Sequence, residues 1–145
     1  MPRSLVFLDA SVLVAASRSP NGGSATALQV CQGVRFRAAV TEKILTEARV
    51  NIAEKFGEAE LLRFYQQLAA LSPRIAGPPS DGHMRSCAPL TAAKDVHVLA
   101  AALSSGASCL LTLDRRHLLT PVVLSTGLPF KVMTPGDFLR GITSE

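Results

Sequence analysis

The chain of 145 residues lacks several features that would place it at once in a broad class. It has no tryptophan, one tyrosine, and no apolar run near the ~18 residues of a membrane-spanning helix. Only four apolar residues lie between Arg3 and Asp9, which is too short for a secretory signal core. The three cysteines are odd in number and widely spaced, which is typical of reduced thiols rather than of a disulfide framework or a zinc site. We therefore expect a cytoplasmic protein with no membrane association.

Acidic residues are scarce as well. The chain has 11 Asp and Glu against 15 Lys and Arg, a formal net charge of +4. A basic protein is compatible with a phosphate-bearing partner, although many basic proteins bind no nucleic acid. With 48% hydrophobic and 18% charged residues, the composition is that of a globular protein, and the length predicts a single domain over residues 1–145.

Apolar runs and helical periodicities alternate along the chain, which predicts an α/β fold with a central parallel sheet. Thr41 and Ser24 are expected to cap helices. The proline- and glycine-rich residues 73–90 are expected to be irregular, apart from a short strand near Ile75. The expected strands are 4–8, 35–40, 107–113 and 130–133, and the expected helices are 11–16, 24–32, 42–56, 61–71, 91–105 and 134–139.

Four of the few acids lie where these elements end or begin. Asp9 and Asp114 directly follow apolar strands, and Glu47 and Asp95 lie in the opening turns of helices. In a parallel sheet these positions meet at one crevice, where ligands bind. Carboxylates gathered there would repel one another unless cations held them, and Mg²⁺ and Mn²⁺ prefer such oxygen ligands. The acids are too far apart in the sequence for a local metal loop such as an EF-hand.

Each acid also has a simpler explanation. Asp9 can cap the helix that follows it, and Asp114 can form an Asx turn. Glu47 can form a surface ion pair with Lys43, and Asp95 is favoured near a helix start by the helix dipole. The metal-site hypothesis depends on the ordered set of four rather than on any one residue.

This ordered set resembles the PIN-domain ribonucleases. The resemblance is carried by residues 7–13 (Phe-Leu-Asp-Ala-Ser-Val-Leu), Glu47, Lys94-Asp95 and residues 111–114 (Leu-Thr-Leu-Asp), and it runs over nearly the whole chain. Residues 134–139 (Thr-Pro-Gly-Asp-Phe-Leu) are also similar to a subgroup of VapC-type toxins of bacterial toxin–antitoxin pairs.

The resemblance implies a three-layer α/β/α fold with a central parallel sheet. It also implies endoribonuclease activity on single-stranded RNA with Mg²⁺ or Mn²⁺ as cofactor, a cognate antitoxin as partner, and a homodimer. By position, the metal-binding and catalytic roles fall to Asp9, Glu47, Asp95 and Asp114.

Other residues are candidates for holding the substrate. Ser11 and Thr112 match small hydroxyl positions of the family, which orient carboxylates or water. Arg115 and Arg116, together with Lys43 and Lys94, flank the acids and can hold RNA phosphates, although solvated surface charge is an equally good reading of each.

One departure from the family pattern keeps a rival reading open. Many relatives carry another acid or Asn just after the last Asp, whereas this chain has Arg115, Arg116 and His117. The site is therefore expected to bind either one or two metal ions. A non-catalytic RNA-binding or scaffold domain is also an open alternative. A phosphatase with Asp9 as nucleophile is disfavoured, because the second Asp usual in that chemistry is replaced by Ser11.

Overall fold

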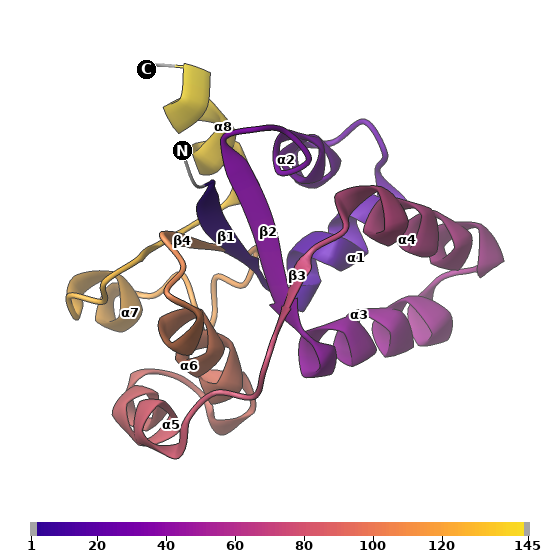
Figure 1. The fold of residues 1–145 in the computed structure, drawn as a ribbon. Helices are drawn as coiled ribbons and strands as arrows, with labels where there is room; N and C mark the ends of the chain where they lie inside the picture. Colours follow the sequence, from indigo (N-terminus) through magenta and orange to yellow (C-terminus); the bar gives the residue numbers. More distant parts are fainter. Residues whose placement is uncertain (1–2, 144–145) are drawn as a thin grey trace.

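A five-stranded parallel sheet lies at the centre of the structure, a computed structural model that describes residues 3–143 (Figure 1). Neighbouring strands follow the order β3-β2-β1-β4-β5, and every pair is parallel. The strands are β1 Ser4–Leu8, β2 Phe36–Thr41, β3 Arg74–Ala76, β4 Cys109–Leu111 and β5 Lys131–Met133.

The middle strands are apolar because both faces of the sheet are covered. In β1, Val6, Phe7 and Leu8 are fully buried, and Leu8 is paired in register with Leu111 of β4. The short outer strands β3 and β5 carry more exposed residues. The most deeply buried part of the sheet is therefore the part that leads to Asp9 and Thr112.

Helices cover the sheet on both sides, which confirms the expected three-layer α/β/α architecture. On one side α1 packs against α2, α3 and α4, and α8 lies against α2. Figure 1 shows α5, α6 and α7 on the opposite side. The helices are α1 Ala10–Arg18, α2 Gly23–Val30, α3 Glu42–Lys55, α4 Glu58–Leu71, α5 Asp81–Cys87, α6 Val96–Ser105, α7 Pro121–Ser125 and α8 Pro135–Thr143.

Local signals in the sequence explain several of the helix ends. Thr41 caps α3 as expected, since its hydroxyl oxygen accepts a hydrogen bond from the backbone N–H of Ile44 (3.2 Å). Gly106 ends α6 in the left-handed conformation (φ 73°), which glycine adopts without strain. The expected cap at Ser24 is wrong: α2 begins one residue earlier after Gly22, and Ser24 is buried inside the helix.

Two short helices were not expected. Residues 73–90 contain α5, capped by the Ser80 hydroxyl, and α7 follows Thr120, which caps it in the same way. Helices of this length are too short to show a helical periodicity in the sequence. None of the helices among the described residues combines the length and apolar character needed to cross a bilayer.

The strand order places a topological switch between β1 and β4. The chain moves outward from β1 through β2 to β3, and then returns to the other side of β1 for β4 and β5. In open α/β sheets, the crevice beyond the carboxyl ends of two such strands is where ligands bind. Asp9 and Asp114 follow these two strands.

Candidate active site

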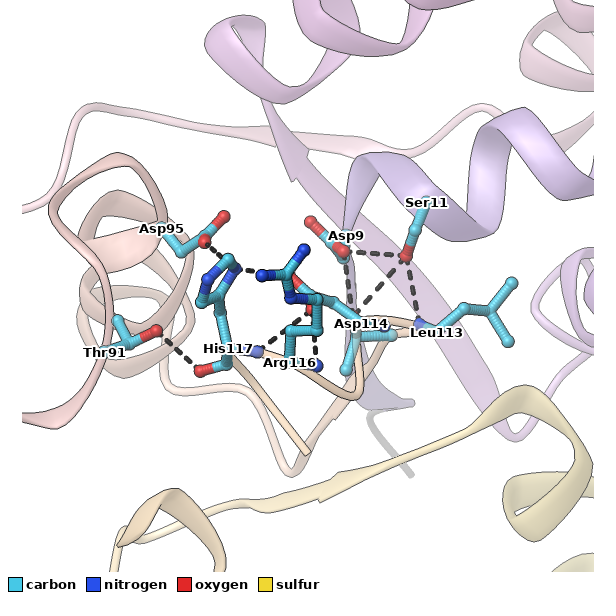
Figure 2. Close-up of polar contacts among 9 residues, drawn as sticks. Asp9, Ser11, Thr91, Asp95, Leu113, Asp114, Arg116 and His117 are labelled. Carbon is cyan, nitrogen blue, oxygen red and sulfur yellow. Dashed lines mark hydrogen bonds and ion pairs between the residues drawn. The ribbon is translucent and has the colours of Figure 1, made fainter. Parts of the chain in front are cut away.

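Asp9 is held in a fixed position at the end of β1. It is buried, with 7% of its surface exposed, and its backbone N–H donates to the carbonyl oxygen of Leu111 (3.0 Å). Its carboxylate oxygen Oδ2 accepts hydrogen bonds from Ser11 Oγ (2.7 Å) and Thr112 Oγ1 (2.8 Å). Asp9 stands at the N-cap position of α1, but its side chain makes no capping hydrogen bond. The carboxylate is therefore directed toward β4 rather than used to cap its own helix (Figure 2).

The two hydroxyl groups form a network that joins the ends of β1 and β4. Ser11 Oγ accepts from the backbone N–H of Leu113, and Thr112 Oγ1 accepts from the backbone N–H of Asp114, both at 3.0 Å. Each hydroxyl thus receives a backbone hydrogen bond while it donates to Asp9. The network fixes Asp9 relative to Asp114, and Figure 2 shows the contacts of Ser11 with Asp9 and Leu113.

Asp114 uses its two oxygens differently. Oδ1 accepts the backbone N–H groups of Arg116 and His117, both at 3.0 Å, so the Asx turn considered above is present. Oδ2 lies 3.6 Å from Nδ1 of His117. The turn therefore orients Asp114 and leaves one carboxylate oxygen facing the other side chains of the site.

Asp95 completes a group of three acids. It ends a short 3₁₀ turn, Ala93–Asp95, and its side chain is 16% exposed. Burial raises the pKa of its carboxyl group, the charges of Lys94 and His117 oppose this, and the charges of Asp114 and Asp9 raise the pKa further. The three acids are therefore close enough to influence one another's ionisation.

Glu47 lies on α3 and makes a different contact. Its Oε1 is 2.9 Å from Nε2 of His97 on α6, without the angle of a hydrogen bond. The ring of His97 is buried, and burial lowers its pKa, although the charge of Glu47 opposes the shift. Among the described residues, Glu47 forms no ion pair with Lys43.

An open cavity of about 710 Å³ joins these elements. Asp9, Glu47 and Asp95 line it, together with the two lysines considered above, Lys43 and Lys94. Asp114 lies beside Asp95 but does not line the cavity, and the exposed side chains of Arg115 and Arg116 do not line it either. A second, mainly apolar cavity of about 520 Å³ borders the first at Lys43 and has its walls in Ile75, Gly77, Pro78, Pro79 and His97.

The donor atoms fit a divalent cation. The ligand-type atoms of Asp95, Asp114 and His117 all lie within 4.8 Å of one another. Asp95 Oδ2 is buried without a hydrogen-bond partner, which is costly for a carboxylate and is relieved by a cation. Carboxylate oxygens at a crevice are suitable ligands for Mg²⁺ or Mn²⁺.

The structure therefore brings Asp9, Asp95 and Asp114 together and places Glu47 across the shared cavity. Two histidines at the site are not among the candidate site residues from the sequence, although His117 stands out because it follows Asp114 closely. Their spacing matches no metal motif, and only the side-chain contacts of the folded chain reveal them: His97 with Glu47, and His117 with Asp95. The closeness of His117 to Asp114 in the sequence was the single available signal.

Comparisons with known proteins identify the family and the fold. A sequence model of the PIN domain matches residues 5–116. Among solved structures, VapBC2 from Rickettsia felis bound to a DNA fragment from its promoter is similar, with a TM-score of 0.67 at 12% sequence identity. The match covers 88% of this chain and 96% of that one, and at this identity it shows the fold alone. No curated protein sequence matches the chain significantly.

Proposed function

The chain belongs to the PIN-domain family, and on this premise we propose that it is a metal-dependent endoribonuclease of single-stranded RNA, the toxin of a toxin–antitoxin pair. The observation that carries the proposal is the meeting of Asp9, Asp95 and Asp114 at the switch point of the sheet. Three acids gathered there at an energetic cost are expected to have a function, because perturbed carboxylates cluster at active sites.

The proposed ligands are Asp9, Glu47, Asp95 and Asp114. The chemistry that a bound Mg²⁺ or Mn²⁺ ion supplies is activation of a water molecule and neutralisation of charge on the phosphodiester. The protein's own contribution is orientation. The hydroxyls of Ser11 and Thr112 hold Asp9, and two backbone N–H groups hold Asp114, so neither carboxylate has to be ordered when the substrate arrives.

Basic side chains around the acids support an RNA substrate. Lys43 and Lys94 line the same cavity as three of the acids, so a phosphate placed beside the carboxylates would lie within their field. Arg115 and Arg116 are exposed at the turn that carries Asp114, where they can contact the next phosphates along the strand. The proposal assigns them to the phosphate backbone.

The second cavity supports a single-stranded substrate. It borders the acidic cavity at Lys43, and its walls at Ile75, Pro78 and Pro79 are apolar. An unstacked base can enter such a space only when it is free of a duplex, and proteins that read single-stranded RNA bind bases in this way. The proposal places a base next to the cleaved phosphate in this second cavity.

An antitoxin and a second copy of the chain are the proposed protein partners, in the cytoplasm. The structural likeness to VapBC2 supports an antitoxin partner. Leu62 and Tyr65 on α4 are exposed apolar side chains, and the proposal assigns them to the contact with such a partner.

Incubation of the purified protein with a panel of single-stranded and duplex RNAs tests the proposal. Cleavage of single-stranded RNA is expected with Mg²⁺ or Mn²⁺ and not with EDTA. Asp114→Asn should be inactive, whereas Asp81→Asn, which neutralises an exposed acid at the start of α5, should retain activity. Binding of RNA without cleavage under all conditions would favour the non-catalytic alternative, and cleavage in EDTA would contradict metal dependence.

A further inference from the structure

His117 lies against two of the acids that the proposed function treats as metal ligands. Its Nδ1 is 3.1 Å from Oδ2 of Asp95 and 3.6 Å from Oδ2 of Asp114. Figure 2 shows the ring between the turn that carries Asp114 and the short turn that carries Asp95. Two ligands of one small cation lie up to roughly 4.2 Å apart when the bonds are about 2.1 Å. Both distances from Nδ1 fall within that limit.

The position of the ring is fixed by its backbone. The N–H of His117 donates to Oδ1 of Asp114 (3.0 Å), and its carbonyl oxygen accepts a hydrogen bond from Thr91 Oγ1 (2.5 Å). The next residue, Leu118, is fully buried and donates its backbone N–H to the carbonyl oxygen of Asp114 (3.2 Å). His117 is therefore anchored on both sides, and its side chain is only 28% exposed.

The contact with Asp95 is not a hydrogen bond. Asp95 Oδ2 is buried, and no donor among the described residues approaches it with suitable geometry, although Nδ1 of His117 is only 3.1 Å away. A simple ion pair would direct an N–H group at that oxygen. Two lone-pair atoms this close to each other without a hydrogen bond fit a shared cation.

We propose that Nδ1 of His117 is a nitrogen ligand of the cation held by Asp95 and Asp114, and that this part of the site prefers Mn²⁺ to Mg²⁺. The inference rests on the proposed function and adds a ligand to it. Mg²⁺ binds almost entirely through oxygen and keeps several waters. Imidazole suits transition-metal ions, and Mn²⁺ accepts oxygen ligands as well. A site with two carboxylates and one imidazole is thus better matched to Mn²⁺.

Titration of the metal-free protein with Mn²⁺ alone and with Mg²⁺ alone, followed by calorimetry, tests the preference. His117→Ala is expected to weaken Mn²⁺ binding by at least about 10-fold, as losses at metal sites do, and to change Mg²⁺ binding by less than about twofold. His117→Asp should bind Mg²⁺ more tightly than the unaltered protein does, because it supplies a third carboxylate. His83→Ala is the matched control, since His83 contacts Ser104 on the outer helices.

A spectroscopic readout identifies the ligand directly. Pulsed electron paramagnetic resonance of the Mn²⁺ complex should show coupling to a ¹⁴N nucleus, lost in His117→Ala and kept in His83→Ala. His97→Phe removes the second nearby imidazole, which contacts Glu47. This variant should keep the ¹⁴N signal, because the signal is expected to come from His117. If His117→Ala does not fold, His117→Gln serves in both measurements.

Equal Mn²⁺ affinities with and without the imidazole, or ¹⁴N coupling that persists in His117→Ala, would overturn the assignment of His117. Failure of this inference is distinguishable from failure of the proposed function. If Asp95→Asn abolishes both Mn²⁺ binding and RNA cleavage while His117→Ala changes neither, the metal-dependent nuclease stands and only the nitrogen ligand falls. If the unaltered protein binds neither ion, both the proposed function and the assignment of His117 are wrong.

Discussion

The hydroxyl group of Thr112 donates a 2.8 Å hydrogen bond to the carboxylate of Asp9, which links the residues that follow β4 and β1. Thr112 is fully buried, and the same oxygen accepts the backbone N–H of Asp114. One side chain thus connects two of the proposed metal ligands.

Replacement of this hydroxyl by a methyl group in Thr112→Val should lower both stability and activity. The buried carboxylate of Asp9 loses a donor, and the N–H of Asp114 loses its acceptor. Leaving such groups unsatisfied costs about 1–3 kcal/mol of unfolding free energy. Urea unfolding measures the loss, and Thr26→Val, which removes an exposed hydroxyl that donates to the carbonyl of Gly22, is the control. Equal effects of the two substitutions would show that the link between the strands is not specific.

Asp95→Asn should abolish metal-dependent RNA cleavage while the fold survives. Asn is nearly isosteric with Asp but lacks the charge that holds a hard cation. The substitution also removes a buried charge whose Oδ2 has no hydrogen bond, so it breaks no hydrogen bond of that oxygen, although it weakens the contact with His117. Cleavage assays and circular dichroism together check the expectation. Cleavage at the unaltered rate by a folded Asp95→Asn protein would remove Asp95 from the site.

RNA binding should weaken steeply with salt, and Arg115→Ala/Arg116→Ala should reduce that dependence. Each phosphate of a single strand that the protein no longer neutralises lowers the log–log slope by ~0.7. Binding measured in EDTA over a range of salt concentrations avoids cleavage. The double variant Lys55→Ala/Arg85→Ala removes the same charge from exposed positions outside the cavity. An identical slope change in both variants would indicate a net-charge effect rather than binding of phosphates at this turn.

The unfolding free energy of the metal-free protein should depend on pH through Asp95. Burial raises the pKa of this carboxyl group in the folded protein above its usual value of 3.8. The folded state therefore holds the proton more tightly than the unfolded chain, so the contribution of Asp95 is full below that usual value. It is lost as the pH rises through the raised pKa. The stability of the unaltered protein minus that of Asp95→Asn should fall with increasing pH; a difference that rises would contradict the burial of this acid.

Most of the site features that the sequence predicted lie at the ends of strands. Asp9 and Asp114 were predicted to lie at the crevice because an acid directly after a buried strand of a parallel sheet lies at the carboxyl edge of that sheet. Thr41 was recognised as a helix cap because capping is a local interaction. These features depend on neighbours in the sequence, so no tertiary information was needed.

The histidine contacts depend on tertiary packing and could not be predicted. His97 on α6 contacts Glu47 on α3, and His117 in the turn after β4 contacts Asp95 at the start of α6, so each contact joins residues that are far apart in the sequence. The helix α5 was missed in a segment rich in proline and glycine, since its seven residues carry no apolar period. The metal-binding and substrate-binding roles of the individual residues stay predictions.

Divalent cations should stabilise the protein, and the gain should disappear when a ligand acid is neutralised. Burial is the main cause of the raised pKa of Asp95, and the charges of Asp114 and Asp9 raise it further, so this carboxylate is disfavoured when no cation is present. A cation binds these acids when folding has brought them together and not when they are dispersed in the unfolded chain. At one hundred times its dissociation constant it should add about 2.7 kcal/mol to the unfolding free energy.

That gain corresponds to a rise of several degrees in melting temperature for a domain of this size. Thermal melts in EDTA and in millimolar Mn²⁺ measure it for the unaltered protein, for Asp95→Asn and for Asp137→Asn. The last variant neutralises an exposed acid that pairs with Arg140 on α8, so it should respond to Mn²⁺ as the unaltered protein does. Asp95→Asn should not respond. If all three melt higher in Mn²⁺ by the same amount, the cation acts on the protein surface in general and the acids at the end of β1 and β4 do not bind it.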